Sequence, residues 1–211
     1  MRSTLRCGRN ERGSGYNSRG CGLSTPRCSV QFVEDVRALL EGEWEQVSKA
    51  ALAAWLVFYG LFLLHALTDQ DGFLVVDNAN LIVHEAGHLL FGWLGPTLGL
   101  WGGTLLELLV PLALLIYFVL HRQTTGAVFA AFFLFENLLY ISVYIADARA
   151  QVLPLVTVGD PEAGEHDWFL ILSGLGLLRR DLWIARVVRT VGWLGMLGTV
   201  GWLGTRAKAG S

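Results

Sequence analysis

The chain has 211 residues, of which 53% are hydrophobic and 16% are charged, with a formal net charge of −2. This length is enough for one domain with a core, but the composition is too apolar for an ordinary soluble protein of that size. The slightly negative net charge gives no case for nucleic acid as a partner. We therefore expect a membrane protein, and its eight tryptophans suit the interfacial belts of that class.

Residues 1–30 form a tail rich in Arg, Gly and Ser, and it contains all three cysteines, Cys7, Cys21 and Cys28. The tail has no apolar run that would serve as a signal-peptide core, and its cysteines have no C-x-x-C spacing. We expect it to be disordered. The alternatives are an over-extended gene start, an Arg-rich transit peptide, and a metal or disulfide role for the cysteines.

Two helices are expected next. In residues 31–49 apolar side chains recur at helical spacing between acidic ones, which predicts an amphipathic helix at the membrane surface, or else an ordinary packed surface helix. Residues 50–67 then carry no charge and would form about 27 Å of helix, enough for a first span. His65, near the end of this span, is interpreted as an interfacial side chain.

The most informative segment is His84-Glu85-Ala86-Gly87-His88, which lies between two apolar runs. On an α-helix its two histidines are one turn apart on one face, so both imidazoles can reach one Zn²⁺, and Glu85 can take a proton from a metal-bound water. Ionisable groups in membrane segments are costly and usually mark function. The pattern predicts a hydrolase site within the bilayer, with a chance or purely structural HExxH as the alternative.

The uncharged, glycine-rich segment Gly95–Gly103 predicts a break that dips into the membrane around a cavity. Further spans are expected at 104–120, at 126–147, and from residue 182 or 187 to 203. The expected fold class is therefore an all-α polytopic helix bundle of about five spans. Its membrane domain covers residues 50–205, and a short polar tail follows at 206–211.

Basic residues set the expected orientation of the chain. Residues 68–80 contain three aspartates and no Lys or Arg, so we expect them outside the cytoplasm. The arginine-rich region 148–189 and the N-terminus are both expected on the cytoplasmic side.

Polar residues also line one face of the span at 126–147. Glu136, Tyr140, Tyr144 and Asp147 follow one another at offsets of four, four and three, with Asn137 at the edge of that face. Such a face should point into the protein or into water, and an interhelical hydrogen-bond seam is the alternative.

A second polar group, His166-Asp167-Trp168, follows a polar turn and leads directly into an apolar run. Metal ligation by this group is one interpretation. The other is a helix start capped by Asp167 and anchored at the membrane interface by Trp168.

The chain resembles the M50 group of site-2-type intramembrane zinc metalloproteases, and more closely a set of bacterial M50B-like membrane proteins of unassigned function. The resemblance rests on HEAGH, the Gly95–Gly103 break, and Asn137 with Asp147-Ala148 two spans later, and it covers roughly residues 50–178. It implies that Asp147 is the third zinc ligand, although Ala148 replaces the family's glycine and the prolines between Asn and Asp are absent. It also implies a location in the bacterial inner membrane.

Counting residues along the two helices gives a different third ligand. If the HEAGH helix starts near Asn78 and the later span starts near Gly126 on the same side, His88 and Glu136 both lie about 15 Å deep. The candidates for the third ligand are therefore Asp147, Glu136 and His166, in that order.

These observations predict a Zn²⁺-dependent metalloprotease that cleaves membrane-embedded or membrane-proximal peptides. In this hypothesis His84, His88 and Asp147 bind the metal, Glu85 is the general base and then the acid, and Asn137 orients the substrate backbone. The alternatives are a zinc hydrolase of lipid amides or esters, and a membrane protein that binds metal without catalysis. The bilayer is the expected partner, and nucleic acid is not.

Overall fold

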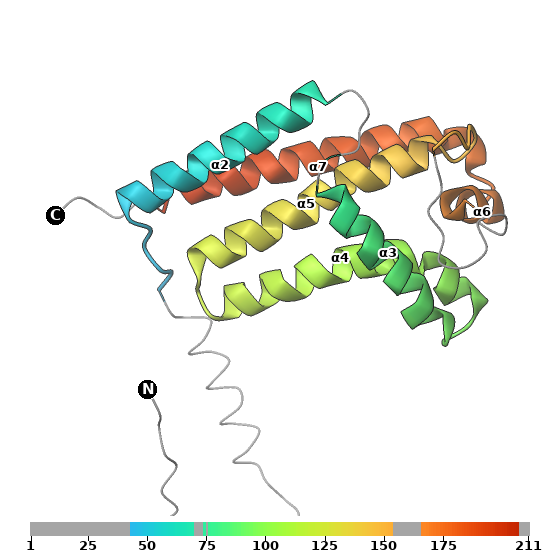
Figure 1. The fold of residues 1–211 in the computed structure, drawn as a ribbon, viewed down its shortest axis with the longest axis horizontal. Coiled ribbons are helices and arrows are strands. Elements are labelled where there is room, and N and C mark those ends of the chain that lie inside the picture. The colour runs from blue at the N-terminus through green and yellow to red at the C-terminus, as the bar shows by residue number, and fades with distance from the viewer. Residues whose placement is uncertain (1–42, 70–73, 75, 154–165, 207–211) are drawn as a thin grey trace, which may run out of the picture. The chain divides into compact units, whose positions relative to one another are not determined.

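The structure of the chain is a computed structural model, and it describes residues 43–69, 74, 76–153 and 166–206. Regular structure in these ranges is helical, as the sequence predicted (Figure 1). The α-helices are α2 (Lys49–Thr68), α3 (Asp77–Gly92), α4 (Pro96–Leu120), α5 (Thr124–Ala146), α6 (Asp167–Gly174) and α7 (Asp181–Gly204), with a 3₁₀ turn η2 (Leu178–Arg180) before α7. The expectations for residues 1–30 and for the tail from residue 207 onward lie outside the described residues.

Three of the described helices, α2, α4 and α5, are long and apolar enough to cross a membrane, with 20, 25 and 23 residues. The chain thus has the helices of a membrane protein. The expectation of about five spans is met by these three only. Helix α3 is short for a span at 16 residues. Helix α7 has enough length, but its five glycines and two arginines lower its mean hydropathy.

Helix α5 is the central element of the bundle, with α7 and α4 packed along it (Figure 1). Half of its most apolar stretch is buried, compared with 22% for α4 and 11% for α2. Gly192 and Gly195 of α7 contact α5 closely, since a Cβ on either would collide with Phe135. Gly198 and Gly201 face open space instead.

Three parts of the chain meet at one end of the bundle, which we call the Trp44 end. The Glu45 N–H donates to the Arg122 carbonyl, in the turn between α4 and α5, at 3.0 Å. The Val47 N–H donates to the Arg206 carbonyl, after α7, at 3.2 Å. The start of α2, the end of α4, the start of α5 and the end of α7 therefore lie together.

The opposite end, which we call the α6 end, contains the turn between α3 and α4, the end of α5, α6 and the start of α7 (Figure 1). There the Arg149 guanidinium pairs with the buried Asp181 carboxylate at 2.6 Å, which links the end of α5 to the start of α7. Helix α7 then runs antiparallel to α5 back to the Trp44 end.

This arrangement corrects the expected topology. Helices α2 and α4 run in opposite directions, because the start of one is bonded to the end of the other. The chain therefore leaves α2 and enters α4 at the same end, so α3 does not connect opposite ends as a span would. Residues 148–153 and 166–181 follow α5 and lie at the α6 end, whereas α2 starts at the opposite end. The basic-residue rule had placed the N-terminal side of α2 and the region after α5 together in the cytoplasm.

The expected glycine-rich break is much shorter than residues 95–103. The turn consists of Trp93, Leu94 and Gly95, and only Gly95 has a positive φ, 119°, a conformation that glycine adopts without strain. Pro96 then begins α4, where its missing N–H costs nothing. Gly99, Gly102 and Gly103 are helical, so this segment is a packing surface and not a loop.

The expected amphipathic helix at 31–49 lies mostly outside the described residues. Its described end, residues 43–48, is not helical. Instead Ser48 caps α2, since its hydroxyl accepts a hydrogen bond from the Ala51 N–H at 3.2 Å.

Candidate metal centre

The site begins with a very close contact between α3 and α4. A Cβ on Gly87, inside the HEAGH segment, would collide with the carbonyl of Gly102, and a Cβ on Gly103 would collide with the imidazole of His84. Only glycine allows the two backbones to approach this closely. The glycines of both helices thus place the HEAGH face directly against the first turns of α4.

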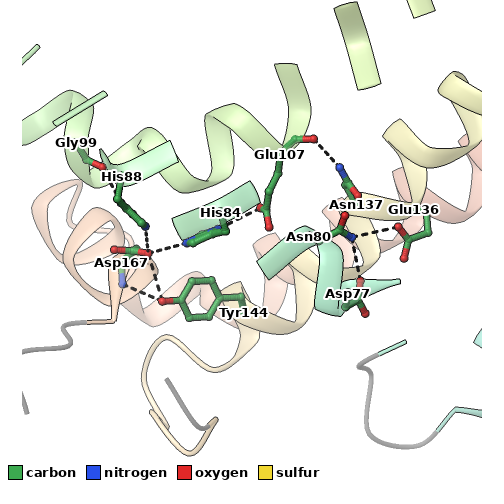
Figure 2. A network of polar contacts seen from close by, with 10 residues as sticks. All are labelled: Asp77, Asn80, His84, His88, Gly99, Glu107, Glu136, Asn137, Tyr144 and Asp167. Atoms are coloured by element: carbon green, nitrogen blue, oxygen red, sulfur yellow. Dashed lines mark hydrogen bonds and ion pairs between the residues drawn. The ribbon is translucent and has the colours of Figure 1, made fainter. Parts of the chain in front are cut away.

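His84 and His88 converge on one carboxylate, that of Asp167 at the start of α6 (Figure 2). The Asp167 Oδ2 lies 3.0 Å from His84 Nε2 and 3.1 Å from His88 Nε2. His84 is buried, and the side chains of His88 and Asp167 are 25% and 15% exposed. The three groups therefore form a half-enclosed cluster contributed by two helices.

The other nitrogen of each imidazole faces an acceptor. His84 Nδ1 lies 3.3 Å from Oε2 of Glu107, a carboxylate of α4 that is 1% exposed. His88 Nδ1 lies 2.8 Å from the Gly99 carbonyl oxygen. The acceptors beside both Nδ1 atoms would keep a proton on Nδ1 when a metal ion takes the place of the proton that each Nε2 shares with Asp167.

Asp167 is held in place by its own helix and by α5. Its backbone N–H donates to the Tyr144 hydroxyl oxygen at 3.3 Å, and that hydroxyl lies 3.4 Å from Asp167 Oδ2. Burial raises the pKa of this carboxyl, but the hydrogen bonds and positive charge of His84 and His88 outweigh burial and hold the pKa at about 2. Asp167 is therefore an anion throughout the physiological range.

This donor set fits a divalent metal ion of the zinc type. Among the described residues, His84, His88 and Asp167 are the group whose ligand atoms all lie close enough together, within 4.8 Å, to hold one ion. Two imidazoles and one carboxylate are a common ligand set of catalytic zinc. With bonds of about 2.0–2.2 Å, tetrahedral ligand atoms lie roughly 3.3–3.6 Å apart, close to the separations of Asp167 Oδ2 from the two Nε2 atoms.

Glu85 lies next to His84 on α3 and is half-buried. Among the described residues it forms no hydrogen bond and no ion pair, in contrast to the other carboxylates around the histidines. Its carboxylate therefore forms no polar link between the described helices.

Asp147, which the resemblance proposed as third ligand, lies in a different group. Its carboxylate accepts hydrogen bonds from the backbone N–H groups of Val152 and Leu153, both at 3.0 Å, and so shapes the turn after α5. It also lies 3.4 Å from His166 Nε2. His166 in turn caps α6, because its Nδ1 accepts from the Phe169 N–H at 3.3 Å. The structure does not bring Asp147 or His166 to the two histidines.

Glu136 lies with the start of α3 and not with the histidines. Asn80 donates to Glu136 Oε2 at 3.4 Å and to Asp77 Oδ1 at 3.1 Å (Figure 2). The contact sets the register between α3 and α5, with Asn80 level with Glu136 and His84 near Tyr144, whose ring centroid is 5.7 Å away. The depth count failed because α3 begins beside the middle of α5, not beside its start.

Asn137 is buried, and it donates from Nδ2 to the backbone carbonyl of Glu107 at 2.5 Å. Four residues after Glu107, Pro111 has no N–H with which to bond that carbonyl in the helix. Asn137 therefore satisfies an acceptor that the proline leaves open. The prediction that it orients a substrate backbone stays a prediction.

Two groups of the site, Asp167 and Glu107, carry signals that the sequence interpretation did not use. Asp167 was recognised as part of a polar group at a helix start, but it was not placed among the candidates for the third ligand. Glu107 was visible as a carboxylate inside an apolar span, which is costly and usually functional. Trp168 was expected at the membrane interface, whereas it is buried against Trp101, with ring centroids 5.8 Å apart.

Comparisons of the chain with protein-family models, with curated proteins and with solved structures gave no match. The resemblance to the M50 proteases therefore rests on the HEAGH segment alone, because the glycine-rich segment and Asp147 are not arranged as that resemblance implied.

Proposed function

We propose that this protein is a zinc-dependent membrane hydrolase that cleaves peptide bonds in or near the bilayer. The observation that carries the proposal is the convergence of His84 Nε2 and His88 Nε2 on Asp167 Oδ2, with an acceptor behind each imidazole. Ligating histidines usually have such acceptors on the second ring nitrogen, which a chance HExxH has no reason to possess.

In this proposal His84, His88 and Asp167 hold the ion, and Asp167 replaces Asp147 as the third ligand. A Zn²⁺ ion bound there would polarise the scissile carbonyl and make a bound water acidic near neutral pH. Glu107 and the Gly99 carbonyl would fix the orientation of the imidazoles.

Glu85 would act as the general base and then return the proton to the leaving amine. Its position next to His84 in the chain and its lack of a hydrogen bond or ion pair among the described residues support this role. Tyr144 would hold Asp167 through its hydroxyl. Substrate segments would have to unwind locally, because the amide groups of an intact helix are bonded within the helix.

The test compares the wild-type protein with the Glu85→Gln variant, both purified in detergent. We expect about one zinc ion per chain in both, measured by inductively coupled plasma mass spectrometry. Peptide cleavage should be lost only in the variant, because a neutral amide cannot accept the proton. Loss of zinc from the variant would show that Glu85 is a ligand, and unchanged cleavage would rule it out as the base.

The same samples can distinguish the proposed protease from a lipid hydrolase and from a protein that binds metal without catalysis. Membrane peptides with a helix-breaking residue are offered beside lipid amides and esters, and the products are identified by mass spectrometry. Cleavage of lipids alone would replace the proposed protease by a lipid hydrolase. Full zinc content with no product from any substrate would favour a non-enzymatic metal-binding role.

A further inference from the structure

A groove lies between α4 and α7, over the face of α5 near the Trp44 end. Its walls include Leu115 and Val119 of α4 and Gly198 and Thr199 of α7, and Ala131 of α5 is part of its floor. The cavity volume is about 430 Å³, which is within the range of roughly 300–1,000 Å³ that is typical of small-molecule sites.

The lining of this groove is apolar although it contains a hydroxyl. Thr199 donates its hydroxyl to the Gly195 carbonyl of its own helix at 2.8 Å, so it presents its methyl group to the groove. A Cβ on Gly198 would meet no atom within 4 Å, so open space lies at that position of the wall. Because α4 and α5 have the length and hydropathy of membrane spans, a groove on their surface would face the hydrocarbon region if both helices cross a bilayer.

Two tryptophans close the groove at the Trp44 end, and an arginine guanidinium lies against each of their rings. Trp44 and Trp202 line it there and contact each other edge to face, with ring centroids 4.9 Å apart. The guanidinium of Arg206 lies 4.7 Å from the Trp202 ring, and that of Arg122 lies 5.1 Å from the Trp44 ring. Tryptophan and arginine are the side chains that anchor proteins at the level of lipid headgroups.

One of these cations has an open hydrogen-bonding position. The Nε of Arg206 is buried and has no hydrogen-bond partner among the described residues. An unsatisfied N–H of a guanidinium is costly, and a phosphate oxygen is the acceptor that suits its geometry best. The apolar groove therefore has an anion-seeking group beside its Trp44 end, in an adjoining pocket that Glu43 and Glu45 also line.

We propose that this groove binds one anionic glycerophospholipid, with an acyl chain along α5 between α4 and α7 and the phosphate at Arg206 and Arg122. The site is separate from the His84–His88–Asp167 cluster, which lies toward the α6 end. The proposal does not depend on the hydrolase function, and the two fail independently.

Lipid binding is measured by native mass spectrometry on the detergent-purified chain, titrated with phosphatidylglycerol or phosphatidylcholine of the same acyl composition. We expect one tightly bound phosphatidylglycerol and binding of phosphatidylcholine at least fivefold weaker. Replacing Arg206 or Arg122 by glutamine should each lower the preference for the anionic lipid by about fivefold, the effect of one cation at an anionic surface. Equal binding of both lipids by the wild-type protein would overturn the proposal.

The acyl-chain part of the site has a matched pair of variants on α7. Gly198→Leu should fill the groove and abolish binding of either lipid, whereas Gly201→Leu, where a Cβ also meets nothing within 4 Å but which does not line the groove, should bind as the wild type does. An added Cβ meets no atom within 4 Å at either position, so both variants should fold. If Gly198→Leu binds lipid normally, or if it breaks a dimer that the wild type forms, the groove is not a lipid site.

Discussion

At the scale of the residue, the three carboxylates near the candidate site have different roles, and the difference lies in their partners. Asp167 faces two imidazole nitrogens, Asp147 faces two backbone N–H groups, and Glu136 faces an amide. Sequence spacing assigns any of them to a helix face, but it does not specify what lies across from that face. The HEAGH residues were predictable because their geometry is local to one helix, whereas the third ligand depends on how α6 packs against α3.

The identity of the third ligand gives the first prediction at this scale. Asp167→Asn should lower the affinity for zinc by at least 100-fold, because it removes the one anionic ligand of the set. Asp147→Asn should leave zinc affinity unchanged, since its carboxylate shapes the turn after α5. Competition with a zinc-binding dye measures both. Zinc loss from the Asp147 variant together with retention in the Asp167 variant would restore the alignment to M50 and exclude Asp167 as a ligand.

Asn137 gives the second prediction at this scale. Asn137→Ala should lower the free energy of unfolding by about 1–3 kcal/mol, because the buried Glu107 carbonyl loses its donor. In a Pro111→Ala background the same substitution should cost less, because the alanine that replaces Pro111 supplies a helical N–H to that carbonyl. Unfolding of all four chains in mixed micelles gives the coupling between the two positions. Additive costs, with a rise in KM for Asn137→Ala alone, would assign Asn137 to substrate binding instead.

At the scale of the element, glycine has two roles that composition cannot separate. Gly95 makes the turn between α3 and α4, whereas Gly87, Gly102 and Gly103 lie inside helices and allow them to touch. The sequence pattern predicted a break over the whole segment from Gly95 to Gly103, because glycine is usually unfavourable inside a helix. The pairing of glycines across two helices is a tertiary property, so the break was predicted over too many residues.

The contact between α3 and α4 can be tested at Gly103. Gly103→Ala should displace the His84 imidazole and lower zinc affinity by about tenfold or more, since shifts of a positioned ligand are costly. Gly92→Ala, at the end of α3, is the matched control because a Cβ there meets nothing within 4 Å. Zinc affinity and the zinc-dependent rise in Tm are measured for both. Equal behaviour of the two variants would mean that the glycine contact does not position His84.

At the scale of the whole molecule, the sequence predicted the all-α class and about five spans, and three of these, α2, α4 and α5, are candidate spans in the structure, because long apolar stretches can be recognised without tertiary information. It counted α3 as a further span because the segment is apolar. The position of α3 along the bundle is set by its contacts with α4 and α5. A hydropathy window covers only neighbouring residues in the sequence, so it carries no information on those contacts.

The topology is the prediction that belongs to this scale. Asp69 at the end of α2 and Leu178 before α7 should lie on the same side of the membrane, and Arg122 should lie on the other, because α2 and α4 run antiparallel and α7 returns to the Trp44 end. Single cysteines at these positions, in a chain whose three native cysteines are replaced by serine, are labelled with a membrane-impermeant maleimide on intact and on opened cells. Labelling of Asp69→Cys and Leu178→Cys from opposite sides would make α3 a full span and exclude the packing of Asp167 against His84 and His88. Labelling from one side would place the candidate metal centre in a segment that enters and leaves the membrane by the same face, where a substrate can approach from that side.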